Sequence, residues 1–364
     1  MAKAYTDAEL EIAGRVPNRR DPQGPGFPVY SFPEDSRQGM RDLYAGKGVW
    51  IPTNVETQNF CPQIIPDNIA RGMVIEKNRI PVEQYGGPDM FGVRWTYVPA
   101  VEGSMEDPDQ GHLFDDANDW EDVLVFPDVD SWDWAGSAEA NKEWLDNGKD
   151  NRFWLLNGAG FERLISFMGF EDAAVALIDE DQTEALQALL DRLADLYCDI
   201  IDHVAGYYGD AVSSFHYHDD WGTQKDPFFS VDVASELFVA PAKKITDRMK
   251  YHGIIADLHS CGMVGPQIEN IIAAGWQSWQ PMAINNTQEL YEKYGDKIIL
   301  GVADDPLPKG ATIEEQQAQA EAFIERFYSP EKPCTFSRYS VNNLTDAYRE
   351  ALYRASRMKA AVTA

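Results

Sequence analysis

The chain has 364 residues, of which 44% are hydrophobic and 25% charged, a normal globular composition with ample length for a large core. Its formal net charge of −29 repels phosphate backbones and anionic lipids, so nucleic acids and membrane surfaces are not expected partners. An acidic surface also suits a partner protein that docks through a basic face.

The expected location is the cytoplasm. The N-terminal stretch is polar and lacks the apolar core of a signal peptide, and no window reaches the roughly 18 apolar residues of a membrane span. Four cysteines in a chain of this length do not form a disulfide scaffold, so we expect reduced thiols. Reduced thiols can bind a metal ion.

The N-terminal half contains one predicted strand and a long irregular region. We predict the strand at residues 48–54 and interpret residues 60–150, rich in Gly, Pro, Asp and aromatic residues, as an insertion. Within the insertion, hydrophobic residues alternate and predict a strand or hairpin, namely Phe91, Val93, Trp95 and Tyr97. The insertion is expected either to cover the site as a lid or to pack as a surface excursion.

From residue 150 onward, short apolar runs alternate with amphipathic helices. We predict further strands at 152–158, 211–222, 254–262, 276–282, 297–305 and 333–341. The predicted helices are 182–209, 234–253 (divided by its proline), 266–275, 312–328 and 344–362. Seven strands joined by helices favour a parallel sheet in an α/β fold, first a (β/α)8 TIM barrel forming one domain over residues 1–364, and second a doubly wound sheet.

Reactive residues follow several of these predicted strands. The carboxyl ends of parallel strands line the active site in α/β proteins. The residues that we place there are His216, His218, Asp219, Asp220, Trp221, Gln224, His259, Cys261, Asp304, Asp305, Cys334 and Arg338.

An H-x-C pair, His259 and Cys261, follows a predicted buried strand, and Cys334 belongs to a later one. Thiolate sulfur and imidazole nitrogen are donors that zinc prefers, and three protein ligands leave a position open for catalysis. Buried structural cysteines and a capping histidine would account for the same residues. The sequence has neither a phosphate-binding glycine loop nor a Gly-x-Ser-x-Gly elbow, which argues against nucleotide binding of those types and serine hydrolysis.

The stretch from "HYHDDWG" to "LHSCG" resembles the uroporphyrinogen decarboxylase superfamily, specifically its zinc- and corrinoid-dependent methyltransferase branch. That branch has a D-D-x-G-x-Q segment, a helix with F…P…K, an H-x-C and a distant cysteine. The matching residues are Asp219, Asp220, Gly222, Gln224, Phe238, Pro241, Lys244, His259, Cys261 and Cys334. The segments "NGAGFERLISFMGFEDA" and "GGPDMFGVRWTYVP" resemble members that O-demethylate methoxylated aromatics, and the resemblance covers about residues 40–350.

The resemblance implies a (β/α)8 barrel with zinc held by His259, Cys261 and Cys334. It also implies methyl transfer from a methoxylated aromatic compound to the cob(I)alamin of a separate corrinoid protein. We expect catalytic roles for Asp219, Asp220 and Glu56. Residues expected to bind or orient substrate are Trp95, Tyr97, Phe161, His218, Trp221, Gln224, Asp304 and Arg338, the last of which could meet a substrate carboxylate.

Three alternatives remain open at this point. The same zinc site could activate a small thiol, such as coenzyme M, that takes a methyl group from methylcobalamin. Zinc could instead stabilise a non-catalytic binding protein. Decarboxylation without metal is disfavoured because "GRVPNRRDP" has arginines without the pattern of the decarboxylase proper. The methyl donor stays open, as does a homodimer.

Overall fold

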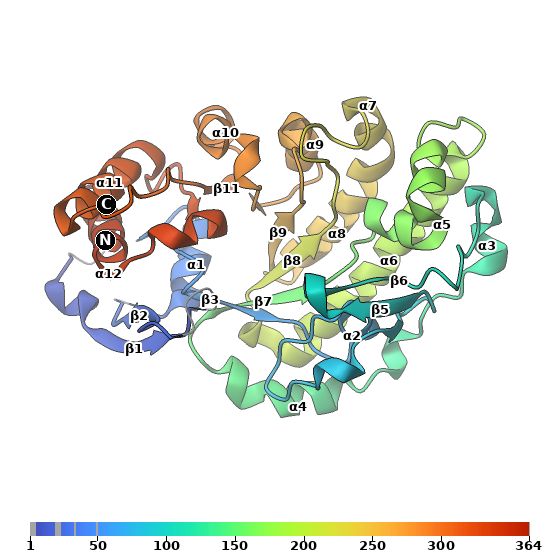
Figure 1. The fold of residues 1–364 in the computed structure, drawn as a ribbon, viewed down its shortest axis with the longest axis horizontal. Coiled ribbons are helices and arrows are strands. Elements are labelled where there is room, and N and C mark those ends of the chain that lie inside the picture. The colour runs from blue at the N-terminus through green and yellow to red at the C-terminus, as the bar shows by residue number, and fades with distance from the viewer. Residues whose placement is uncertain (1–4, 19–22, 33, 49, 364) are drawn as a thin grey trace. The chain divides into compact units, whose positions relative to one another are not determined.

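The structure is a computed structural model that describes residues 5–18, 23–32, 34–48 and 50–363 (Figure 1). The chain divides into two compact units. The terminal unit comprises residues 1–58, 148–150 and 277–364, and the central unit comprises residues 59–147 and 151–276. No helix among the described residues is both long and apolar enough to span a membrane.

The central unit contains three adjacent parallel strands, β7 (Asp150–Leu155), β8 (Ser214–His218) and β9 (Ile255–His259) (Figure 1). Trp154 pairs with His216, and His218 pairs with His259. Side chains alternate between the two faces of a strand, so the polar residues of these strands share one face. The residues on that face are Trp154, His216, His218, Asp257 and His259, whereas Phe153, Phe215 and Leu258 point the other way.

Helices follow these strands. They are α5 (Phe161–Ala176), α6 (Thr183–Tyr208), α7 (Val231–Val233), α8 (Val239–Tyr251) and α9 (Ile268–Ala273). Helix α6 packs against α8 and buries a stripe with helical spacing that includes Leu186, Leu189, Leu190, Leu193 and Leu196. Burial of this stripe removes the leucines from water and anchors the helix beside the strands.

The insertion forms its own small elements within the central unit, and the predicted hairpin is confirmed. Strand β5 (Arg94–Val98) pairs antiparallel with β4 (Gly87–Pro88) and with β6 (Gly103–Glu106). The helices of this region are α2 (Pro66–Ala70), α3 (Trp120–Val123) and α4 (Trp134–Leu145). Its role as a lid stays a prediction.

The terminal unit begins with an antiparallel pair, β1 (Ile12–Val16) and β2 (Phe27–Tyr30), followed by α1 (Ser36–Tyr44). Its later part contains β10 (Ser278–Trp279), β11 (Ile299–Val302) and β12 (Thr335–Phe336), which pair in parallel. The helices between and after them are α10 (Thr287–Tyr294), α11 (Ile313–Phe327) and α12 (Asp346–Thr363). The predicted α/β class is therefore confirmed, and this arrangement is consistent with a TIM-like barrel.

The prediction of a strand at 48–54 is wrong for the residues described there, and β3 occupies Thr57–Phe60 instead; Val49 lies outside the described residues. Pro52 lacks an N–H for a strand ladder. The carboxylate of Glu56 accepts hydrogen bonds from the backbone N and Oγ1 of Thr53 at 2.7 and 2.6 Å. This local pairing turns the chain and competes with an extended ladder.

Two other predictions need correction. Strands β10 and β12 contain two residues each, and a 3-10 helix over Arg338–Asn343 replaces the end of the predicted last strand. Pro241 does not divide two helices, because it is the third residue of α8 and the helical backbone continues on both sides of it. A π-helical turn at Ala234–Phe238 leads into α8.

Candidate metal centre

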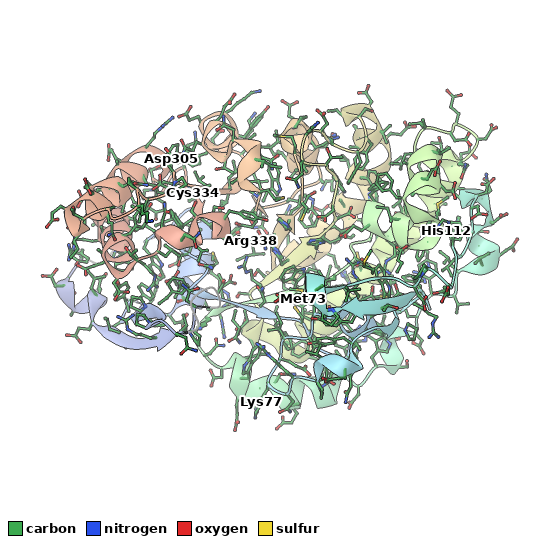
Figure 2. All side chains as sticks on the ribbon, in the orientation of Figure 1. Met73, Lys77, His112, Asp305, Cys334 and Arg338 are labelled. Carbon is green, nitrogen blue, oxygen red and sulfur yellow. The ribbon has the colours of Figure 1, made fainter. Side chains whose placement is uncertain are left out.

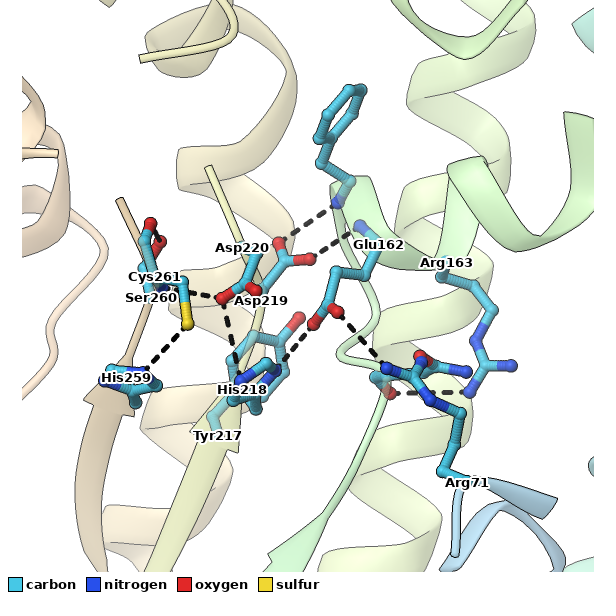
Figure 3. A network of polar contacts seen from close by, with 12 residues as sticks. Arg71, Glu162, Arg163, Tyr217, His218, Asp219, Asp220, His259, Ser260 and Cys261 are labelled. Carbon is cyan, nitrogen blue, oxygen red and sulfur yellow. Dashed lines mark hydrogen bonds and ion pairs between the residues drawn. The ribbon is translucent and has the colours of Figure 1, made fainter. Parts of the chain in front are cut away.

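Four potential metal ligands meet at the carboxyl ends of β8 and β9: His218, Asp220, His259 and Cys261 (Figure 3). One ligand atom from each residue lies within 4.8 Å of the ligand atoms of the others. His259 Nε2 lies 3.4 Å from Cys261 Sγ, and His218 Nε2 lies 3.6 Å from Asp220 Oδ1. We call these four residues the donor group.

Parallel register and two short turns create the donor group. The two histidines are paired last residues of β8 and β9, and each of the other donors follows its histidine by two residues. The backbone N–H of Cys261 donates to Asp220 Oδ1 at 2.6 Å. The next residue, Gly262, has a φ of +88°, and a Cβ there would lie 2.1 Å from the carbonyl oxygen of Gly222. Only glycine allows the two turns to approach so closely.

The donor group fits a zinc ion by chemistry and by spacing. Two nitrogens, one sulfur and one oxygen form a set that borderline-soft Zn²⁺ accepts. Ligand atoms of a tetrahedral zinc lie roughly 3.3–3.6 Å apart, given bond lengths of about 2.0–2.3 Å. The His259–Cys261 and His218–Asp220 separations of 3.4 and 3.6 Å lie in this range.

Glu162, from the first turn of α5, orients one of the histidines. Its Oε2 lies 2.7 Å from Nδ1 of His218, and its Oε1 lies 3.8 Å from the guanidinium of Arg71 (Figure 3). Burial acts to lower the pKa of His218, but Glu162, Cys261 and Asp220 together raise it well above its usual value. The surroundings of His218 thus favour positive charge, which either a proton on the imidazole or a metal ion in place of that proton would supply.

Asp219 holds the turn after β8 against helix α5. Its carboxylate accepts hydrogen bonds from the backbone N–H of Phe161 at 3.0 Å, that of Glu162 at 2.8 Å and the indole N–H of Trp221 at 2.6 Å. Gly160 makes room for it, since a Cβ there would lie 2.0 Å from Asp219 Oδ2. Burial and the charge of Glu162 raise the pKa of Asp219 to about 7, although the three N–H groups act to lower it.

A second polar pair, His216 and Asp257, lies two residues earlier along β8 and β9 on the same face. His216 Nδ1 and Asp257 Oδ2 are 2.5 Å apart, with the Arg152 guanidinium 3.5 Å from the same carboxylate oxygen. The His216 ring is nearly parallel to that of His259, with the ring centroids 6.1 Å apart. The His216 ring therefore lies beside the His259 ring of the donor group.

Glu162, which contacts His218, also lines a cavity of about 520 Å³ in the central unit. Trp95, which we predicted to bind substrate, lines the cavity, and its ring lies 4.4 Å below the guanidinium carbon of Arg71. Tyr97 is not among the lining residues and instead contacts Tyr85, with ring centroids 5.2 Å apart. The cavity size is typical of a small-molecule site.

Three other predicted substrate residues follow β7 and β8. Phe161 is fully buried and Trp221 nearly so, and both pack against Phe229 at ring centroid distances of 5.3 and 5.4 Å. Gln224 is exposed in the turn that follows. The structure thus gives the two aromatic residues packing contacts, and their roles in substrate binding stay predictions.

Four predicted site residues belong to the terminal unit, and their roles stay predictions. Cys334 (Figure 2) is buried, and its thiol donates to the carbonyl oxygen of Phe327 at 2.8 Å, while burial raises its pKa. Glu56 is buried and forms an ion pair with Arg349. Asp304 Oδ2 accepts a hydrogen bond from the Tyr348 hydroxyl at 2.6 Å. Arg338 (Figure 2) donates to the Tyr339 hydroxyl at 3.0 Å.

Sequence reasoning missed Glu162 and Arg71. Glu162 stands in the quoted segment "NGAGFERL", shortly after a predicted strand, so its position at a strand end was an available indication. Arg71 lies in the insertion, and no local pattern connects it with the strand ends.

The fold and the donor group define an α/β protein with a TIM-like architecture and a candidate metal centre. No protein family model and no curated protein matches the sequence. A solved structure described as a methyltransferase from Methanosarcina mazei has a similar fold, with a TM-score of 0.59 over 88% of this chain and 98% of that chain. The two sequences are 14% identical, so this similarity establishes the shared fold alone.

Proposed function

We propose that the protein transfers a methyl group from a methoxylated aromatic compound to the cob(I)alamin of a corrinoid protein, with zinc at the donor group. The observation that carries the proposal is a zinc-compatible donor group whose His218 contacts Glu162, a residue that also lines a cavity of about 520 Å³. The sequence resemblance and the likeness to a structure named a methyltransferase support the same reaction class.

Bound at the donor group, zinc would supply a Lewis acid that polarises the ether oxygen and stabilises the phenoxide as it leaves. The protein's own residues orient the ligands. Glu162 accepts a hydrogen bond from Nδ1 of His218, which leaves Nε2 free to face the other donors. Such carboxylate partners fix the tautomer and the ring orientation of a histidine ligand.

Two ligand sets follow from the sequence and the structure. The resemblance predicts His259, Cys261 and Cys334, which leaves one position open, whereas the donor group uses His218 and Asp220 beside the H-x-C pair. Four protein donors would close the zinc coordination. Asp220 is then the ligand most readily displaced, because the N–H of Cys261 offers its carboxylate another partner at 2.6 Å.

Zinc content separates the two sets. Purified protein would be analysed by elemental mass spectrometry as wild type and as His218→Ala, Asp220→Asn, Cys261→Ser and Cys334→Ser variants. Cys198→Ser is the matched control, because Cys198 lies on α6 outside the donor group. Loss of zinc from Cys261→Ser but not from the control supports a zinc site. A full complement of zinc in Cys261→Ser would exclude the proposed centre, and the Cys334→Ser result decides between the sets.

The activity test mixes the protein anaerobically with cob(I)alamin and a panel of methoxybenzenes, methoxyphenols and methoxybenzoates. A visible spectrum that shifts to the methylated cobalamin, and that a zinc chelator prevents, is the expected result. A net charge of −29 leads us to expect that the natural corrinoid protein docks through a basic face. The absence of a shift with every aromatic donor would contradict the proposal and direct the same assay to thiol methylation.

A further inference from the structure

The walls of the cavity that contains Glu162 combine apolar and charged side chains from β5, β6 and α5. Trp95, Ile165 and Phe170 supply apolar surface, which suits the faces and edges of an aromatic ring. The charged lining residues are Arg71, Arg94, Glu106, Asp107 and Glu162. The three carboxylates outnumber the two guanidinium groups in this lining, which also contains His112 (Figure 2).

Both arginines of the lining already have partners. Arg71 lies over the Trp95 ring at 4.4 Å and has Glu162 at 3.8 Å. Arg94 is 62% exposed at its side chain and lies 3.7 Å from Asp107. A substrate carboxylate would add negative charge to a lining already rich in it and would have to compete for these cations.

Glu106 differs from the other charged residues of the lining. Among the described residues, its carboxylate has no hydrogen bond and no ion pair within 4 Å, although burial raises its pKa. It pairs directly with Trp95 across the β5–β6 hairpin, so the carboxylate and the indole lie side by side on one face. A half-buried acceptor without a hydrogen-bond partner, beside an aromatic wall and with Arg71 and His112 acting on its charge, is suited to a neutral O–H donor.

We infer that this cavity binds a neutral methoxyphenol, with its ring against the Trp95 and Phe170 side of the cavity and its hydroxyl donating to Glu106. This inference rests on the proposed function and narrows its substrate class to phenols over benzoates. The hydrogen bond from a hydroxyl to a carboxylate is charge-assisted and shorter than a neutral one. Its loss typically weakens binding about tenfold or more.

Calorimetric titration at pH 7 tests the inference on the full chain with 2-methoxyphenol, 1,2-dimethoxybenzene and 2-methoxybenzoate. We expect wild-type protein to bind 2-methoxyphenol about tenfold more tightly than either other ligand. Glu106→Gln should weaken the binding of 2-methoxyphenol about tenfold and leave the affinity for 1,2-dimethoxybenzene within about twofold of wild type. The matched control is Glu171→Gln, an exposed acid on α5 that is not among the lining residues, and it should change neither affinity.

Phe170→Ala is a second variant that does not alter charge. It removes part of the apolar wall and should weaken the binding of 2-methoxyphenol and of 1,2-dimethoxybenzene by the same factor. Tightest binding of 2-methoxybenzoate, or an unchanged affinity of Glu106→Gln for 2-methoxyphenol, would overturn the inference.

The binding measurement needs neither zinc nor cobalamin, so it separates this inference from the proposed function. The expected binding order without methyl transfer would refute the reaction and leave the phenol site intact. Methyl transfer from methoxybenzoates in preference to methoxyphenols would support the reaction and refute the phenol site.

Discussion

Replacement of Asp219 by alanine should destabilise the protein strongly, although the residue was predicted to be catalytic. The carboxylate is buried and accepts three hydrogen bonds, from two N–H groups at the start of α5 and from the Trp221 indole. Alanine leaves all three donors without this acceptor, at about 1 kcal/mol or more each. We therefore expect Asp219→Ala to lower the free energy of unfolding by about 3 kcal/mol or more.

The neighbouring Asp220 provides the matched control. It is half-buried and accepts a hydrogen bond from the Cys261 backbone N–H, so Asp220→Ala should cost about 1 kcal/mol. Both variants would be unfolded in urea with a chelator present, which removes any contribution of bound metal. An Asp219→Ala variant that unfolds within about 1 kcal/mol of wild type, or that is more stable than Asp220→Ala, would refute this account.

Three further predictions address other residues. Glu162→Gln should weaken zinc about 10- to 100-fold in a competition titration, because the histidine that Glu162 orients loses its carboxylate partner; an unchanged affinity would contradict this. Burial raises the pKa of Cys198 to about 11, so iodoacetamide at pH 8 should label the half-buried Cys261 first by peptide mass spectrometry, and zinc should slow that labelling; equal rates at both thiols would count against it. Glu56→Gln should cost about 3–5 kcal/mol of stability, since it leaves Arg349 buried without its carboxylate, and a thermal midpoint equal to that of wild type would show the pair to be unimportant.

The main elements could be predicted from local patterns, and the errors have local causes. The leucine stripe of α6 and its terminal Gly209 predicted that helix almost to the residue. The helix predicted at 312–328 likewise matches α11, whose N-cap Thr312 forms a capping box with Glu315. Hydrophobicity alone misplaced the strand at 48–54, because Glu56 binds the backbone of Thr53 and turns the chain there.

Part of the candidate site could be predicted because two of its residues are close in the sequence. His259 and Cys261 lie two residues apart after an apolar run, so their proximity is encoded locally. His218 and Asp220 lie beside them because β8 and β9 pair in a particular register. A single sequence does not give that register directly. Whether Cys334 also contributes stays a prediction from the resemblance.

The sequence by itself determined the α/β class, most helices and the strand ends at which polar residues collect, because these features follow from hydrophobic period and chain punctuation. Tertiary structure decided which polar groups meet. Glu162, at the start of α5, contacts His218, at the end of β8. Arg71 and Glu106 belong to the insertion and line the same cavity as Glu162. Such contacts depend on side-chain packing between segments distant in the chain. The local spacing of hydrophobic residues therefore does not predict them.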